Sequence, residues 1–132
     1  MAKYVYPVVL TPEEGGYYAK FPDIESCYTQ GDNLADTLEM AKDILSIRLC
    51  DYEDEKKDIP KASAQEALTL ENGQILSLVS ADTMEYRRLW DSKAMKKTLT
   101  IPTWLNTLAE KADVNFSAVL QKALKEELQL IE

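Results

Sequence analysis

The chain has 132 residues, of which 45% are hydrophobic and 29% charged, and its 15 basic and 23 acidic side chains give a net charge of −8. The apolar fraction is too high for a disordered chain, so we expect one or two small folded domains. Because the sequence contains no histidine, imidazole metal ligands and the Ser-His-Asp and Cys-His catalytic arrangements are excluded.

Cys27 and Cys50 are isolated thiols without the spacing of a zinc site or of a disulfide framework. We therefore expect two buried thiols in a reducing compartment. The first ten residues lack the features of a secretory signal, and no apolar run approaches the roughly 18 residues of a membrane span. These observations predict a cytoplasmic protein without a membrane segment, and no motif calls for a cofactor.

The first half of the chain predicts a three-stranded meander followed by a helix. Runs rich in β-branched and aromatic residues at 3–10 and 17–21 flank the turn sequence EEGG, and a third run covers residues 25–30. The tripeptide Gly31-Asp32-Asn33 offers helix caps, and apolar residues from Leu34 to Leu49 then recur at helical spacing. With a further strand at 74–80, this order predicts a βββαβ domain over residues 1–82.

An enzymatic interpretation of this half would need carboxylates that converge on metal ions. The first strand, residues 3–10, contains none. Asp23, Glu25 and Asp32 bracket the third strand and form the one candidate metal-binding set, but acidic residues beside turns usually serve as caps or improve solubility. We therefore expect no catalytic residue and no metal site.

Residues 83–94 predict a connector that contains a helical turn, and a different module follows at 95–132. Strand alternation places Leu99 and Ile101 on one face and Lys96, Thr98 and Thr100 on the other. The module thus begins with a strand that has one apolar and one polar face.

Two short helices complete this second module. Pro102 lies where a proline begins a helix, and Asn115 is a good N-cap for the second helix. A single strand with two helices has no partner for its backbone groups and can bury little apolar surface, so it needs a second copy. The expected core of that homodimer consists of Leu99, Ile101, Trp104, Leu108, Val119, Leu120 and Leu124.

Two such strands paired antiparallel would make a ribbon that fits the DNA major groove. Lysine and threonine on its exposed face can contact bases, and the amide groups that open the second helix suit a phosphate. The expected DNA-binding residues are Lys96, Lys97, Thr98, Thr100, Asn115 and Ser117. The alternative is a plain dimerisation unit whose exposed strand residues are only solvated.

These residues form a pattern seen in a known family. Residues 96–128, KKTLTIPTWLNTLAEKADVNFSAVLQKALKEEL, resemble the ribbon-helix-helix module of the Arc and MetJ type. Together with residues 6–45, YPVVLTPEEGGYYAKFPDIESCYTQGDNLADTLEMAKDIL, the chain resembles HicB-family antitoxins of bacterial toxin-antitoxin systems. The resemblance implies an α+β protein with a partial ribonuclease-H-like first domain that does not cut and a ribbon-helix-helix dimerisation domain. It also implies repression of its own operon through operator DNA, and a HicA-like toxin partner, a small basic ribonuclease that cleaves messenger RNA.

The charge distribution fits such a partner. Residues 1–92 have a net charge of −9, whereas residues 93–125 have +4. An acidic domain attracts a basic ribonuclease and raises its encounter rate. As the first candidates for toxin contact we take Pro22, Asp23, Glu25 and Ser26. A stand-alone ribbon-helix-helix repressor whose acidic domain senses a ligand is the alternative function, and pairing of dimers into tetramers is left open.

Overall fold

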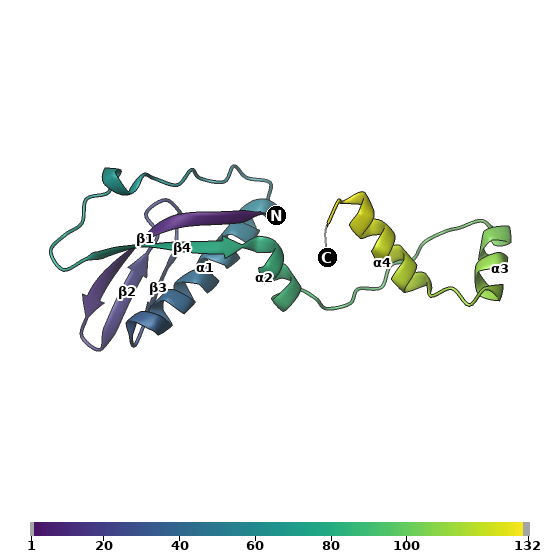
Figure 1. The fold of residues 1–132 in the computed structure, drawn as a ribbon, viewed down its shortest axis with the longest axis horizontal. Helices are drawn as coiled ribbons and strands as arrows, with labels where there is room; N and C mark the ends of the chain where they lie inside the picture. The colour runs from purple at the N-terminus through teal and green to yellow at the C-terminus, as the bar shows by residue number, and fades with distance from the viewer. Residues whose placement is uncertain (1, 131–132) are drawn as a thin grey trace. The chain divides into compact units, whose positions relative to one another are not determined.

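The computed structural model describes residues 2–130, and the chain divides into two compact units, Met1–Lys93 and Ala94–Glu132 (Figure 1). Unit 1 is an α+β unit built on a sheet, and unit 2 contains helices only among its described residues. Residues 131 and 132, which end the predicted second module, lie outside the described part of the chain. The α+β class expected from the sequence is confirmed.

A four-stranded antiparallel sheet with the order β3-β2-β1-β4 forms one layer of unit 1. Its strands are β1 (Lys3–Glu13), β2 (Gly16–Lys20), β3 (Tyr28–Gly31) and β4 (Ile75–Asp82). The central strand β1 pairs with both neighbours, so that Val9 lies between Lys20 and Leu76. The three-stranded meander and the fourth strand therefore form as expected, although β1 runs three residues further and β3 starts at Tyr28 rather than at residue 25.

Two glycines allow the strands and the first helix to approach closely. A Cβ atom on Gly16 would overlap the carbonyl of Gly31, and one on Gly31 would come within 2.6 Å of the Thr37 hydroxyl. Only glycine fits at such contacts, because real Cβ atoms do not approach that closely. The close packing brings β3 directly against the start of the helix.

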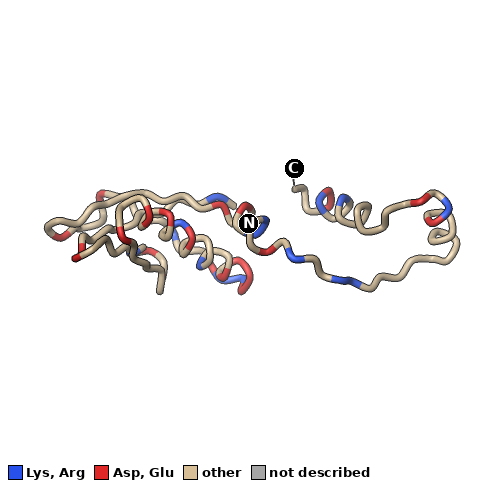
Figure 2. The backbone as a smooth tube through the Cα atoms, turned by 90° about the horizontal axis from the view of Figure 1, so that it is seen from below, with Lys and Arg blue, Asp and Glu red and all other residues tan. Residues whose placement is uncertain are grey.

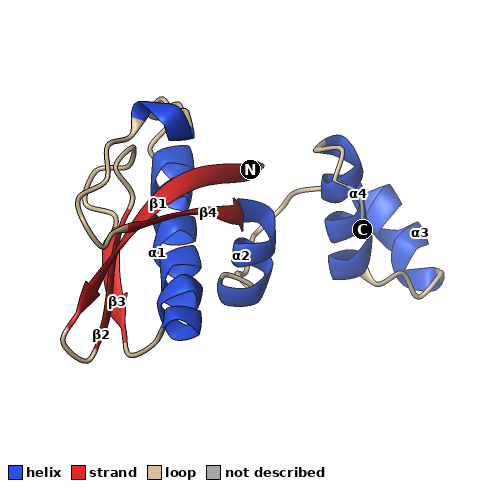
Figure 3. Cartoon of the chain, turned by 60° about the vertical axis from the view of Figure 1, so that its left-hand side comes forward, coloured by secondary structure: helices blue, strands red, loops and turns tan. Residues whose placement is uncertain are grey.

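Helix α1 (Leu34–Asp54) covers one face of the sheet (Figure 3). Asn33 caps it, and its side-chain oxygen accepts the backbone N–H of Asp36 at 2.8 Å. The buried core joins the inner face of the sheet to the apolar stripe of this helix: Tyr6, Val8, Leu10, Ala19, Phe21, Ile24, Cys27, Ala41, Leu45, Leu49, Val79 and Ala81. The helix extends five residues beyond the expected apolar stripe, which ends at Leu49. Its last turn packs against α2 (Thr83–Trp90).

The segment between α1 and β4 contains one short 3₁₀ helix, η1 (Gln65–Ala67), and is attached to the core at several points. Ile59 packs on the core, and the Tyr6 hydroxyl donates to the carbonyl of Pro60. The Asp23 carboxylate accepts both the backbone N–H of Ser63, at 2.9 Å, and the Ser63 hydroxyl. Asp23 thus has a structural partner 40 residues away in the chain.

Helix α2 (Thr83–Trp90) occupies most of the segment expected as a connector. Asp82 caps it by accepting the backbone N–H groups of Met84 and Glu85 at 3.0 and 3.2 Å. Arg87 in this helix donates to the carboxylates of Glu53 and Asp54 at the end of α1. These contacts make α2 part of unit 1.

Unit 2 contains α3 (Thr103–Lys111) and α4 (Phe116–Glu127). The predicted cap at Asn115 is confirmed, since its side-chain oxygen accepts the backbone N–H of Ala118 at 3.0 Å. Pro102 is the N-cap rather than the first residue of α3, so the helix begins one position later than expected. Residues 92–102 have no strand assignment in the single chain, because a strand needs a partner for its ladder of hydrogen bonds.

Candidate interaction surfaces

Unit 2 exposes the residues expected to form its core. Trp104 is 65% exposed, Leu108 57% and Val119 55%, and no residue from 94 to 130 is buried. Leu99, Ile101 and Leu124 are also exposed, and Leu120 is half-buried. Because burying one such side chain contributes about 1.5–3 kcal/mol, an apolar face of this size is unusual in an isolated small unit.

The expected DNA-binding residues are solvent-accessible. Lys96, Lys97, Thr98 and Thr100 lie on the exposed segment before α3. Residues 92–102, which lead to α3, contain lysines and no acidic residue, and Figure 2 shows this stretch in blue and tan. At the start of α4, Ser117 is exposed, while the Asn115 side chain already caps the helix. Asn115 therefore has a structural task in addition to any contact with phosphate.

The four residues expected at the toxin contact lie together in the loop after β2 but differ in availability. Pro22, Glu25 and Ser26 are exposed, whereas Asp23 is half-buried and holds Ser63. Glu25 and Ser26 border a hollow of ≈ 330 Å³ that is also lined by Arg48 and Lys57, so this surface has mixed charge.

The residues that the structure describes offer neither a metal site nor a reactive thiol. Among residues 2–130, no group of three or more Cys, Asp or Glu side chains is arranged to hold a metal ion. The two cysteines are free and buried. Burial raises the pKa of the Cys27 thiol to about 11, which keeps it protonated and unreactive at neutral pH. Over the same residues, no helix is long and apolar enough to cross a membrane.

Glu53 forms a hydrogen-bonded cluster that sequence reasoning did not identify. Its carboxylate accepts the Tyr4 hydroxyl at 3.0 Å, the Thr83 hydroxyl at 2.9 Å and Arg87 at 3.1 Å. Burial of Tyr4, together with the Glu53 carboxylate, raises the pKa of the Tyr4 phenol to about 12. Burial raises the pKa of Glu53, but hydrogen bonds that include these three outweigh it and leave that pKa lowered. The cluster ties β1, α1 and α2 together.

The match to a known protein family lies within unit 1. The family model described as "HicB_like antitoxin of bacterial toxin-antitoxin system" matches residues 5–75, which is more than half of the chain. The chain belongs to the HicB-like antitoxin family. The family resemblance found in the sequence is thereby confirmed, and the family is one of antitoxins rather than of enzymes.

Curated HicB antitoxins match the chain over part of its length. "Antitoxin HicB 1" of Photorhabdus laumondii is 48% identical over 56 residues, which are 42% of this chain and 36% of the relative. "Antitoxin HicB" of Escherichia coli K12 is 44% identical over 59 residues, which are 44% of this chain and 43% of the relative. The match with each of these relatives thus covers less than half of the relative's length.

Solved structures match nearly the whole HicB-like chain. A chain of the "Toxin-Antitoxin complex from Streptococcus pneumoniae" aligns with a TM-score of 0.62 and 27% identity, covering 95% of this chain and 99% of that one. The "Antitoxin HicB3 crystal structure" aligns with a TM-score of 0.53 and 24% identity, covering 94% and 97% of the two chains. The second likeness shows the fold alone. Both support the order of a sheet unit followed by helices.

Proposed function

We propose that this HicB-like chain neutralises a HicA-like toxin through unit 1 and represses its own operon through unit 2 as a homodimer. The family match at residues 5–75 supports the assignment of unit 1. A chain similar to it in fold comes from the "HicA3 and HicB3 toxin-antitoxin complex", with a TM-score of 0.51 and 22% identity. The excess of acidic residues in unit 1 suits a basic partner.

The assignment of DNA binding is carried by the uncovered apolar face of unit 2. Trp104, Leu108 and Val119 are more than half exposed, and Leu99 and Ile101 continue this face along the segment before α3. A second copy would bury these side chains and supply the missing ladder for residues 95–101. The opposite side of that ribbon would then present Lys96, Thr98 and Thr100 to the major groove. The proposed ribbon-helix-helix domain spans residues 95–132. The toxin-binding domain predicted at 1–82 also includes α2 of the connecting segment 83–94, because Arg87 packs α2 against α1.

A partial ribonuclease-H-like ancestry of unit 1 is part of the proposal. The antiparallel meander β1-β2-β3 followed by a helix supports it. The only carboxylate on β1 is Glu13 at its end, where it pairs with Gly16. We propose that the unit binds its partner without cutting RNA.

Co-expression of the full chain with the small open reading frame adjacent to its gene tests the proposal. A stable complex in a pull-down, loss of ribonuclease activity in that complex, and sequence-specific binding to the chain's own promoter are the expected results. Promoter binding without any complex would instead favour a stand-alone repressor. Neither complex nor promoter binding would contradict the whole proposal.

A further inference from the structure

Helix α1 presents a second face, directed away from the sheet, that no element of unit 1 covers along most of its length. Positions 36, 40, 43, 47, 51 and 54 follow at three- or four-residue spacing and therefore share one side of the helix, and position 39, three residues after 36 and four before 43, borders it. Met40 on this side is 46% exposed, and Ile47 is half-exposed. Together with Tyr86 and Trp90 of α2, we call this surface the α1–α2 face.

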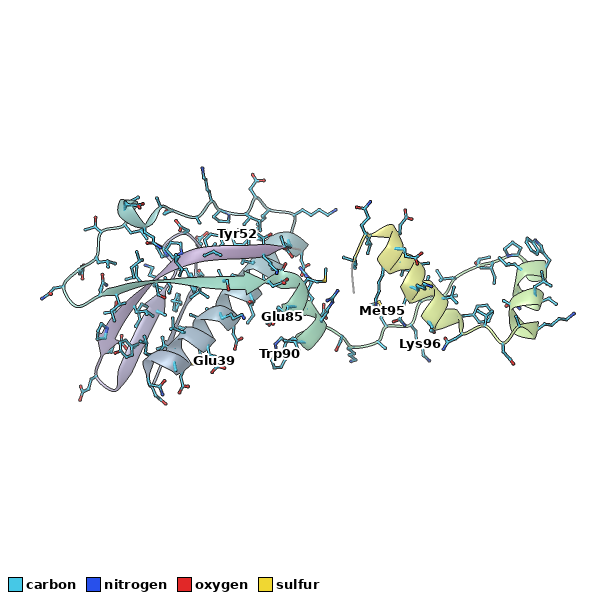
Figure 4. All side chains as sticks on the ribbon, in the orientation of Figure 1. Glu39, Tyr52, Glu85, Trp90, Met95 and Lys96 are labelled. Atoms are coloured by element: carbon cyan, nitrogen blue, oxygen red, sulfur yellow. The ribbon has the colours of Figure 1, made fainter. Side chains whose placement is uncertain are left out.

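An aromatic side chain stands at one end of the α1–α2 face. Trp90 is 72% exposed and borders a hollow of ≈ 250 Å³ together with Ile47, Tyr86 and Arg87. In Figure 4, Glu39 and Trp90 project toward the same lower side of unit 1. A second hollow, of ≈ 290 Å³, lies at the opposite end of α1 beside Met40 and Glu39. Exposed tryptophan next to a hollow is typical of an anchoring point in a protein interface.

Carboxylates run between these apolar positions: Asp36, Glu39, Asp43, Asp51 and Asp54. Asp51 and Asp54 are paired with Arg48 and Arg87. Among residues 2–130, no ion pair joins Asp36, Glu39 or Asp43 to a Lys or Arg side chain. The α1–α2 face therefore has an unbalanced negative charge in its N-terminal half.

We propose that the α1–α2 face is the docking surface for a basic protein partner, whose Lys and Arg side chains meet Glu39 and Asp43 and whose apolar surface receives Trp90 and Met40. The inference rests on the proposed function and names the surface through which unit 1 would hold its toxin. Charge complementarity selects this occupant. Nucleic acid would be repelled, and a second copy of the same face would bring two rows of carboxylates together.

Charge complementarity with a basic partner also favours the α1–α2 face over the loop at Pro22 to Ser26. In that loop Asp23 is already engaged by Ser63, and the hollow beside Glu25 contains two cationic side chains. A basic partner would meet cations as well as carboxylates there, whereas the N-terminal half of α1 carries Asp36, Glu39 and Asp43 against the single cation Lys42.

Binding kinetics of the full chain to the purified protein encoded by the adjacent small open reading frame test the inference. Reversal of the helix charges in E39K/D43K should slow association at low salt by at least about tenfold and flatten its salt dependence. The matched control E66K/E71K makes the same change of net charge at exposed sites outside α1 and should leave the rate within about threefold. Circular dichroism of each variant checks that its fold is retained.

The aromatic anchor is tested separately. W90A should weaken the affinity by about thirtyfold, as expected for an exposed aromatic anchor that becomes buried on binding, whereas L89A removes its exposed neighbour and should change little. Equal binding by E39K/D43K, W90A and the wild type would overturn the inference and leave the proposed function standing. Loss of binding in E25K alone would move the site to the loop. Absence of any complex with the wild-type chain would instead contradict the proposed function itself.

Discussion

The Nη2 atom of Arg87 in α2 lies 3.1 Å from the Oε1 atom of Glu53 in α1 and 2.9 Å from Oδ1 of Asp54. The Arg87 and Glu53 side chains are only 20% and 11% exposed, so water screens this pair weakly. The same Arg87 nitrogen also contacts the carbonyl of Cys50 at 3.3 Å. The interaction holds α2 against the last turn of α1.

Removal of this contact should destabilise unit 1. R87A removes the guanidinium from beside the partly buried Glu53 carboxylate, and we expect a loss of about 1–3 kcal/mol in the free energy of unfolding. Urea denaturation of the full chain, followed by circular dichroism, measures the change. K42A removes an exposed cation from α1 and should change stability by less than about 0.5 kcal/mol. Equal stability of R87A and the wild type would show that α2 does not depend on this pair.

The Glu53 cluster also predicts a pH dependence. The pKa of Glu53 in the folded chain lies below its ordinary value of 4.5, although burial acts in the opposite direction. A lowered pKa means that the ionised group stabilises the folded state above the unfolded-state value and that this contribution disappears as the pH falls through the folded value. The unfolding free energy should therefore decline from about pH 5 downward more steeply in the wild type than in E53Q. Parallel pH profiles would exclude a role for Glu53.

The thiols should be unreactive while unit 1 is folded. Cys27 is almost fully buried and its pKa is raised to about 11, mainly by burial, and burial also raises the pKa of Cys50. At pH 8 we expect alkylation by iodoacetamide to be slow in the native chain and rapid for both thiols in denaturant. Mass spectrometry counts the modified residues. Rapid labelling of native Cys27 would contradict the burial of this side chain.

Caps and the spacing of apolar residues predicted the helices α1 and α4, because helix formation depends on residues that are close in the sequence. Asn33 and Asn115 are both followed by apolar residues at helical spacing, and both act as N-caps. By contrast, the sequence predicts a connector with one helical turn where the longer helix α2 forms, because the contact that stabilises α2 joins Arg87 to a residue 34 positions earlier. The hydrogen bond between Asp23 and Ser63 is likewise beyond local patterns, since the two residues lie 40 positions apart, and the toxin contact at Asp23 stays a prediction. Acidic residues on a surface have no period that separates a binding face from a solvated one.

The apolar face of unit 2 predicts a dimer. L99D places a carboxylate of each copy in the proposed core, which should cost at least about 3 kcal/mol per dimer and weaken association about a hundredfold. Sedimentation velocity over a concentration series measures the dimer fraction. Q121D adds the same charge at an exposed polar position of α4 and should remain as dimeric as the wild type. A fully dimeric L99D variant would place the interface elsewhere in the chain.

The proposed ribbon assigns base reading to Thr98 and Thr100, which alternate with Leu99 and Ile101 and are exposed. Loss of a specific base contact costs on the order of 1–3 kcal/mol, so T98A/T100A should lose its preference for the chain's own promoter. Toxin binding and the dimer should be retained, because both depend on other residues. Lys96 contributes charge, and K96A should weaken binding to all DNA sequences and reduce the salt dependence. Titration of promoter and scrambled fragments with T98A/T100A, beside a toxin-inhibition assay, separates the two roles. Unchanged preference for the promoter would mean that the ribbon is only a dimerisation element and that another surface reads the DNA.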